Sequence, residues 1–259
     1  MSRIPRSSAA IGRRDPRYRW TVSTDLRELP VPAALLFDLD GTLVDTVETR
    51  IASWLEALAA AGFPTTRDRV APLIGMDGRR LARKIALLAG TRLGDEDAES
   101  IDHASGEIYA ELNRAPQALP GVAELVAVLD AQGIAWTIAT SSRQAQVAAS
   151  VAALDLATEP RIVDASHVAH AKPEPDLLLY AAGQTGLPPG RCWYVGDSTW
   201  DMLAAVAAGM IGIGVTAGAA VDAATLLRAG ATATVPDLVA IADALRVSST
   251  DSPARPASG

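Results

Sequence analysis

The chain has 259 residues, of which 49% are hydrophobic, 20% are charged and 4% are aromatic, and its formal net charge is −7. This length can form one large domain or two smaller ones with a sizeable core. The acidic balance argues against general nucleic-acid binding, and no apolar run approaches the roughly 20 residues that a membrane-spanning helix needs.

Residues 1–30 are rich in Arg, Ser and Pro and show little periodicity. They lack the apolar segment of a secretory signal, so we interpret them as a disordered Arg-rich arm, with an organelle transit peptide as the less favoured alternative. Cys192 is the only cysteine, which excludes an intramolecular disulfide and fits a reducing compartment. We therefore expect a cytoplasmic protein.

The first expected strand is the short apolar run 33–36, which is followed directly by the stretch FDLDGTLVD. Asp38 and Asp40 alternate along an extended chain and project to one side of the strand end. Two carboxylates this close repel each other unless they share a cation or a proton. Gly41 permits a tight turn, and Thr42 offers a hydroxyl and an N–H to an anion. The stretch therefore suits a divalent metal and a phosphate, although a solvated turn uses the same residue types.

Helical periodicity then extends over residues 46–118, where helices are expected to begin near Val47, Thr66, Asp77 and Asp95. Consecutive helices without an intervening strand form a compact helical unit rather than βαβ repeats. We therefore predict that residues 46–118 form an all-helical cap domain inserted in the main domain.

Strands and helices alternate over the following part of the chain. The expected strands are residues 134–139, 161–163, 193–195 and 211–215. Strands separated by single helices imply right-handed crossovers and a parallel sheet with helices on both faces. The predicted fold class is α/β, with a Rossmann-like parallel sheet in a core domain of residues 31–45 and 119–247. Residues 248–259, rich in Ser and Pro, are predicted to be a disordered tail.

Ligands of such sheets bind beyond the carboxyl ends of the strands, so the residues that follow each strand are the site candidates. Thr140, Ser141 and Ser142 follow the strand 134–139, and their hydroxyl and N–H groups suit a phosphate at a helix N-terminus. Ser142 suits a helix N-cap equally well.

Two further clusters occupy comparable positions later in the chain. Lys172 lies in KPEP, where Pro173 and Pro175 restrict the backbone, and its ammonium would neutralise charge around a phosphate if it is not simply solvated. Asp197 and Asp201 lie in GDSTWD, one helical turn apart. One of them can bind a metal while the other orients a neighbour, and helix capping is the structural alternative.

The ordered series DxD, Thr/Ser, Lys and DxxxD resembles the motifs of the haloacid-dehalogenase-like (HAD) superfamily across residues 33–215. It is most similar to the branch of phosphoglycolate phosphatases and β-phosphoglucomutases, whose helical cap follows the first motif. The resemblance implies the HAD fold and an Mg²⁺-dependent phosphatase that acts through an aspartyl-phosphate. Its substrate would be a small phosphorylated metabolite, a sugar phosphate or a phosphoglycolate-like molecule.

The resemblance also implies a role for each motif residue. Asp38 would be the nucleophile, and Asp40 the general acid and base. Mg²⁺ would be held by Asp38, the backbone carbonyl of Asp40 and Asp197. Asp201 would lie behind this layer, holding the catalytic Lys172 or a metal-bound water. The phosphate oxygens would be bound by Gly41, Thr42, Thr140, Ser141, Ser142 and Lys172.

The motifs of families with alternative functions differ from this chain at particular positions. The phosphomutases carry a cap His five residues beyond the first motif, where this chain has Arg50, and a Ser-Arg pair where Asp77 and Gly78 follow Gly75. Both departures favour a phosphatase. Asp40 argues against the metal-free dehalogenases, which lack this carboxylate. A non-catalytic phosphate- or nucleotide-binding module is the remaining alternative.

Substrate selectivity is expected to depend on the cap arginines Arg50, Arg79, Arg80 and Arg83. Guanidinium groups pair with carboxylate or phosphate and suit an anionic small molecule, although a solvated helix face would look the same. We interpret His167 and His170 as polar residues of a loop rather than as a pair of metal ligands. The expected partner is a small phosphorylated substrate, with no nucleic acid and no membrane, and the protein is expected to be a monomer or homodimer.

Overall fold

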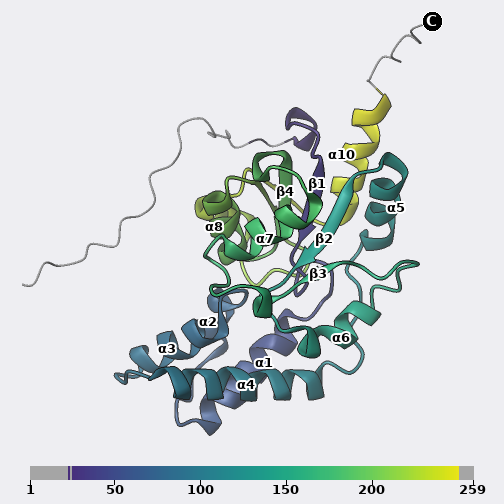
Figure 1. Cartoon of the computed structure of the whole chain (residues 1–259). Helices are drawn as coiled ribbons and strands as arrows, with labels where there is room; N and C mark the ends of the chain where they lie inside the picture. Colours follow the sequence, from purple (N-terminus) through teal and green to yellow (C-terminus); the bar gives the residue numbers. More distant parts are fainter. Residues whose placement is uncertain (1–22, 24, 251–259) are drawn as a thin grey trace, which may run out of the picture.

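The computed structural model describes residue 23 and residues 25–250 (Figure 1). Within this part of the chain, six parallel strands form one sheet in the order β3-β2-β1-β4-β5-β6. The strands are β1 Ala34–Phe37, β2 Ala135–Ala139, β3 Ile162–Val163, β4 Cys192–Gly196, β5 Ile211–Val215 and β6 Ala233–Val235. The predicted α/β class with a parallel sheet is confirmed.

Helices connect the strands and cover both faces of the sheet (Figure 1). The α-helices are α1 Val47–Ala60, α2 Arg67–Val70, α3 Gly78–Leu88, α4 Asp95–Leu112, α5 Val122–Gln132, α6 Gln144–Ala152, α7 Asp176–Thr185, α8 Thr199–Ala208, α9 Ala223–Ala229 and α10 Leu238–Thr250. The short 3-10 helices are η1 Leu26–Glu28, η2 Ala71–Leu73, η3 Ala165–His167 and η4 Pro189–Arg191.

Strand β1 shows why the sheet needs helices on both faces. Its four residues are all buried, and alternate side chains enter different hydrophobic clusters. Leu35 and Phe37 pack in the cluster that includes α5 and α10, whereas Ala34 and Leu36 pack in the cluster that includes α7 and α8. The strand is therefore apolar throughout, as is typical of a parallel strand buried on both sides.

Helices α1 to α4, called the helical unit below, pack around one hydrophobic cluster, which includes Ile51, Trp54, Leu81 and Ile85. The chain enters and leaves this unit through adjacent segments, because Asp45 N–H donates to the carbonyl of Gln117 at 2.9 Å and the Leu119 N–H to that of Leu43 at 2.8 Å. Figure 1 shows the unit beyond one end of the sheet. The division into a core domain and a cap at residues 46–118 stays a prediction.

The ends of the described region differ from the predicted arm and tail. Leu26 is only 7% exposed and packs in the core, and η1 contacts α10, so the prediction of disorder is wrong for residues 25–30. Apolar Leu26 offered a burial signal that the Arg-rich composition obscured. Helix α10 also extends to Thr250, beyond the predicted start of the tail. Residues 1–22, 24 and 251–259, which carry the rest of both predictions, lie outside the described residues.

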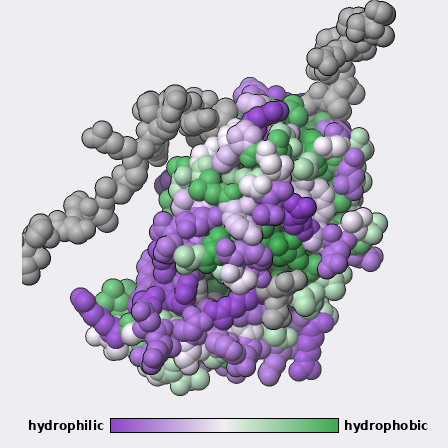
Figure 2. Space-filling model, in the orientation of Figure 1, coloured by the Kyte–Doolittle hydropathy of each residue, from purple (hydrophilic) through white to green (hydrophobic). Residues whose placement is uncertain are grey.

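In the described region, every helix is too short or too polar to cross a bilayer. Figure 2 shows mainly hydrophilic residues on the face that covers the junction between the helical unit and the sheet.

Candidate active site

Two aspartates emerge side by side where neighbouring strands end. Strand β1 pairs in parallel with β4 so that Phe37 lies opposite Val195, and the Asp38 N–H donates to the Val195 carbonyl at 2.9 Å. Asp38 follows β1, and Asp197 follows β4. Both are buried, and carboxylate oxygens of Asp38, Asp197 and Asp201 lie within 4.8 Å of one another. The parallel register therefore brings together two motifs that are distant in the sequence.

Lys172 completes this cluster from the loop before α7. Its Nζ lies 2.7 Å from Asp38 Oδ1 and 2.7 Å from Asp201 Oδ1, and it donates to the Tyr194 hydroxyl at 3.0 Å. The side chain is 0% exposed. Burial alone would lower the pKa of Lys172, but the carboxylates of Asp201 and Asp38 outweigh burial and hold this pKa above its usual value. Lys172 is thus a fixed cation between two aspartates.

The cluster carries more negative than positive charge. Burial raises the pKa of Asp38 to about 7, because the attraction of Lys172 does not offset burial and the charge of Asp201. Burial, followed by the charges of Asp201 and Asp38, raises the pKa of Asp197 well above its usual value. Three carboxylates facing one ammonium would be balanced by one divalent cation, which would favour the ionised form of both acids.

The hydrogen bonds of Asp201 limit which oxygens can bind a cation. Its Oδ2 accepts from the Ser198 N–H at 2.9 Å and from the Ser198 hydroxyl at 2.6 Å. Its Oδ1 accepts from Lys172 at 2.7 Å and from Tyr194 at 3.0 Å. Asp201 is therefore occupied, which fits the role behind the metal layer implied by the resemblance. Asp38 and Asp197 are left as side-chain oxygen ligands, the type that Mg²⁺ prefers.

The turn after β1 is shaped around Asp197. Gly41 has a φ of +81°, and a Cβ at this position would lie 2.3 Å from Asp197 Oδ2. The Thr42 hydroxyl donates to Asp197 Oδ1 at 2.9 Å. The N–H groups of Gly41 and Thr42 donate to the carbonyls of Val44 and Leu39, at 2.8 and 3.3 Å. In this arrangement Gly41 and Thr42 therefore position Asp197, which departs from the prediction that their free donors bind phosphate.

The residues after β2 line a cavity of about 420 Å³ together with Asp38 and Lys172. Thr140 is buried, and its hydroxyl accepts from the Ser142 N–H at 3.1 Å. The Ser141 hydroxyl makes only a 3.3 Å bond to the Gly75 carbonyl. Ser141 is therefore the best placed of the three to exchange its partner for a phosphate oxygen.

Asp40 lies in the same cavity, but its carboxylate is held by four side chains. Oδ1 accepts from the hydroxyls of Thr46 at 2.7 Å and Tyr109 at 2.8 Å. Oδ2 accepts from Arg50 Nη2 at 2.7 Å and from the Ser142 hydroxyl at 3.1 Å. Burial would raise the pKa of Asp40, but Arg50 and the hydrogen bonds outweigh it and hold this pKa below its usual value. The arrangement stabilises the carboxylate form.

Arg50 therefore has a different environment from the one expected for a selectivity residue. It is 9% exposed, and its guanidinium lies 3.3 Å from the centre of the Tyr109 ring as well as beside Asp40. Arg50 lines the cavity, but both its charge and its flat face are already engaged.

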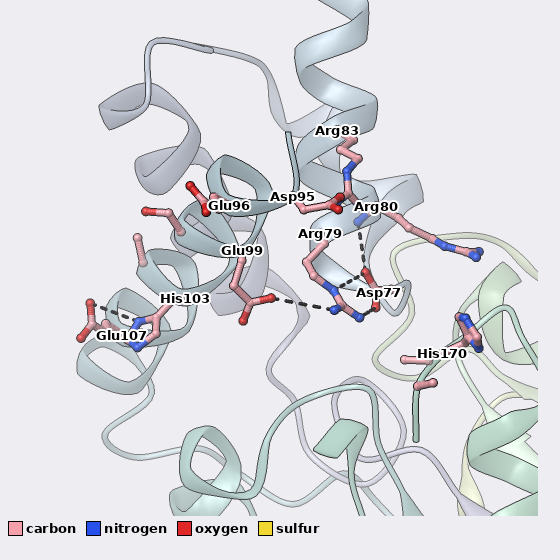
Figure 3. Close-up of a pocket in the computed structure, with 14 residues that line it drawn as sticks. Asp77, Arg79, Arg80, Arg83, Asp95, Glu96, Glu99, His103, Glu107 and His170 are labelled. Atoms are coloured by element: carbon pink, nitrogen blue, oxygen red, sulfur yellow. Dashed lines mark hydrogen bonds and ion pairs between the residues drawn. The ribbon is translucent and has the colours of Figure 1, made fainter. Parts of the chain in front are cut away.

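The other cap arginines lie at the rim. Arg79 lines the cavity and also a larger outer groove of about 1020 Å³. Arg80 and Arg83 line only the outer groove, where they pair with Glu174 at 2.9 Å and with Asp95 at 2.5 Å, respectively. Figure 3 shows the three guanidinium groups in this groove. Arg80 and Arg83 do not line the inner cavity: Arg80 is rotated by about 100° around α3 relative to Arg79, and Arg83 lies about one turn further along the helix.

Two buried tyrosines, Tyr109 and Tyr194, also belong to the site, although neither was among the candidate residues predicted from the sequence. Tyr109 donates to Asp40, and its hydroxyl accepts from Asn113 at 2.9 Å. Tyr194 connects Lys172 with Asp201. The available signal was the hydroxyl itself, because a buried tyrosine normally requires a polar partner.

The two histidines that we interpreted as polar loop residues have carboxylate partners, and Trp200 in the GDSTWD motif also has a polar partner. His167 Nδ1 lies 2.9 Å from Asp164 and His170 Nδ1 3.3 Å from Asp176, and neither is in the carboxylate cluster. The Trp200 indole N–H donates to the Pro72 carbonyl at 3.0 Å, which connects α8 with the helical unit.

Comparison with known proteins gives a consistent family. A family model described as haloacid dehalogenase-like hydrolase matches residues 35–215. Phosphoglycolate phosphatase 1 of Pseudomonas aeruginosa is 32% identical over 186 residues, which is 70% of this chain and 68% of that protein. β-Phosphoglucomutase of Bacillus subtilis is 29% identical over 191 residues, 71% of this chain and 84% of that protein. The crystal structure of a hydrolase from Pseudomonas syringae superposes with a TM-score of 0.77 at 35% identity and covers 83% of this chain and 98% of that one.

Proposed function

This chain belongs to the haloacid dehalogenase-like hydrolase family, and we propose that it is an Mg²⁺-dependent phosphatase of a small phosphorylated metabolite. A sugar phosphate or a phosphoglycolate-like molecule is the proposed substrate, and residues 46–118 are the proposed cap. The observation that carries the proposal is that Asp38, Asp197 and Lys172 converge at one site. The negative charge of the carboxylates there exceeds the positive charge of Lys172.

Asp38 is the proposed nucleophile. One carboxylate oxygen is held by Lys172 at 2.7 Å, which fixes the side chain while the other oxygen remains for attack on phosphorus. As the new P–O bond forms, the bond from phosphorus to the leaving oxygen breaks and an aspartyl-phosphate results. Water then attacks phosphorus, the bond to Asp38 breaks, and inorganic phosphate is released.

Asp40 is the proposed acid and base. It would protonate the leaving oxygen in the first step and take a proton from water in the second. Since Arg50, Thr46, Tyr109 and Ser142 stabilise its carboxylate form, proton donation requires some of these bonds to be exchanged for contact with the substrate. Asp40 is therefore in the ionised form that acts as a base. It must lose some of these hydrogen bonds and gain a proton before it can act as an acid.

Asp38, Asp197 and the backbone carbonyl of Asp40 are the groups that would hold Mg²⁺. When bound, this ion would supply charge neutralisation for the transferring phosphoryl group. Lys172 adds a further positive charge 2.7 Å from Asp38, and Ser141 lines the same cavity, where its hydroxyl is placed to donate to a phosphate oxygen.

Release of inorganic phosphate tests the proposal. Purified protein is screened against sugar phosphates, phosphoglycolate and nucleotides, with Mg²⁺ or with EDTA, alongside Asp38→Asn. We expect turnover with Mg²⁺, none with EDTA, and none for Asp38→Asn of unchanged circular dichroism. Equal turnover by Asp38→Asn would remove Asp38 as the nucleophile and with it the mechanism.

A phosphomutase is the second candidate, since the B. subtilis relative bears that name. Arg50 argues against it, because its ion pair with Asp40 occupies the position where the sequence resemblance implies a histidine in mutases. Incubation with β-glucose 1-phosphate and a bisphosphate activator separates the two functions. Free phosphate supports the phosphatase, whereas isomerised sugar phosphate supports the mutase.

A further inference from the structure

The arginines that surround the cavity are already neutralised. Arg50 pairs with Asp40, and Arg79 pairs with Asp77 at 2.8 Å. Arg143, on the opposite wall, pairs with the carboxylate of Glu99. An incoming anionic leaving group would therefore meet guanidinium groups whose positive charge is already balanced by a carboxylate. The number of arginines alone does not make this cavity a site for a second anion.

One carboxylate of the wall has no such partner. Asp102, on α4, lines the cavity that contains Asp38. Among the described residues, none forms a hydrogen bond or an ion pair with its side chain, and Arg143 and Arg79 act on it only through their charges. Burial raises the pKa of Asp102 to about 6, because the attraction of Arg143 is offset by burial and by the charges of Asp77 and Glu99. At neutral pH this group is mainly a carboxylate with unused acceptor positions.

The position of Asp102 depends on a glycine of the neighbouring helix. A Cβ on Gly78, the first residue of α3, would lie 1.9 Å from Asp102 Oδ1 and 3.0 Å from Trp54 Cζ2. The missing side chain thus leaves room for the carboxylate beside the indole. Trp54 also lines the cavity, so an apolar surface and a hydrogen-bond acceptor lie next to each other on its wall.

We propose that Asp102 selects the leaving group by accepting a hydrogen bond from it, so that the preferred substrates are phosphates of hydroxylated molecules, such as sugars or polyols, rather than phosphates of carboxylic acids. This inference rests on the phosphatase function and narrows its substrate class. A leaving group with a hydroxyl fills the unused acceptor of Asp102. A leaving group with a carboxylate instead places two like charges in a partly desolvated cavity, which is unfavourable.

Two small substrates isolate this effect. Hydroxyethyl phosphate and phosphoglycolate differ only in a CH₂OH group against a carboxylate. We expect kcat/KM of the wild type to favour hydroxyethyl phosphate by about tenfold or more, the size expected for one hydrogen bond to a charged group. Asp102→Asn keeps the size of the side chain and removes its charge, and it should reduce this preference about tenfold, chiefly by raising the rate with phosphoglycolate.

A control and a second variant separate recognition from damage to the fold. Asp97→Asn makes the same chemical change at an exposed position of α4 outside both cavities, and it should leave the preference unchanged. Gly78→Ala should displace Asp102 and reduce the preference without removing its charge. A purely structural role for Asp102 would lower both rates together and leave their ratio unaltered.

The outcomes also distinguish this inference from the proposed function. Release of phosphate from p-nitrophenyl phosphate, with a substrate preference that Asp102→Asn does not alter, would overturn the role of Asp102 and keep the phosphatase. A wild type that prefers phosphoglycolate would do the same. Failure to release phosphate from these three compounds and from every sugar phosphate and nucleotide of the wider screen, in the presence of Mg²⁺, would overturn both.

Discussion

The ion pair between Arg50 and Asp40 allows a quantitative test of the site geometry. The two side chains are 11% and 9% exposed and are joined by Nη2–Oδ2 and Nε–Oδ2 distances of 2.7 and 3.1 Å. Arg50→Met removes the guanidinium and retains an unbranched chain over Tyr109. Removing one partner of a buried ion pair typically costs about 3–5 kcal/mol. Asp40 keeps three hydroxyl donors and borders the cavity, so we expect a smaller cost than this, about 2–3 kcal/mol.

A double-mutant cycle separates the ion pair from the other contacts. Arg50→Met, Asp40→Asn and the double variant are compared by thermal unfolding without Mg²⁺, followed by tryptophan fluorescence. In a chain of this size, about 1 kcal/mol corresponds to a shift of about 2–4 °C in Tm. We expect Arg50→Met to lower Tm by about 4–12 °C and the double variant to be more stable than the sum of both changes predicts. Shifts that add within about 0.5 kcal/mol would refute the direct coupling of Arg50 and Asp40.

Substitutions of Gly41 and Asp102 test local features of the site, and Gly62→Ala is the control for the first. Gly41→Ala should lower stability and abolish phosphate release, because its φ of +81° is unfavourable for Ala and its Cβ would lie 2.3 Å from Asp197 Oδ2. Gly62→Ala has a φ of +85° and open space around the new Cβ, so it should show the backbone cost alone, about 1–2 kcal/mol, with normal activity. Asp102→Asn should stabilise the protein by about 1–2 kcal/mol above pH 6, because the folded pKa of about 6 lies above the ordinary value and ionised Asp102 therefore opposes folding. This gain should diminish between pH 6 and pH 4, where wild-type Asp102 becomes protonated. A difference in unfolding free energy between Asp102→Asn and the wild type that is independent of pH over this range would contradict the prediction.

The sequence was sufficient to predict the parallel sheet and the convergence of the main motifs at one edge of it. Apolar runs separated by single helices determine a parallel order, and the carboxyl ends of parallel strands share one edge. For this reason Asp38 and Asp197, 159 positions apart by their numbers, could be expected at one site, and the structure brings their oxygens within 4.8 Å together with Asp201.

The contacts between the helical unit and the sheet could not be predicted from the sequence in the same way. Periodicity shows which face of a helix is apolar, but it does not give the rotation of that helix against a neighbouring domain. Arg50 and Tyr109 lie on different helices, and only their packing reveals that both hold Asp40. Asp102 could not be predicted as a site residue from the sequence, because its position in the cavity depends on the absence of a side chain at Gly78.

Trapping of the reaction intermediate tests the central claim most directly. Turnover with the best substrate and Mg²⁺ is quenched with acid, and the phosphorylated peptide is identified by mass spectrometry. We expect phosphate on Asp38 during turnover and none in Asp38→Asn. Phosphate attached to any other residue, or undiminished turnover in Asp38→Asn, would contradict this expectation.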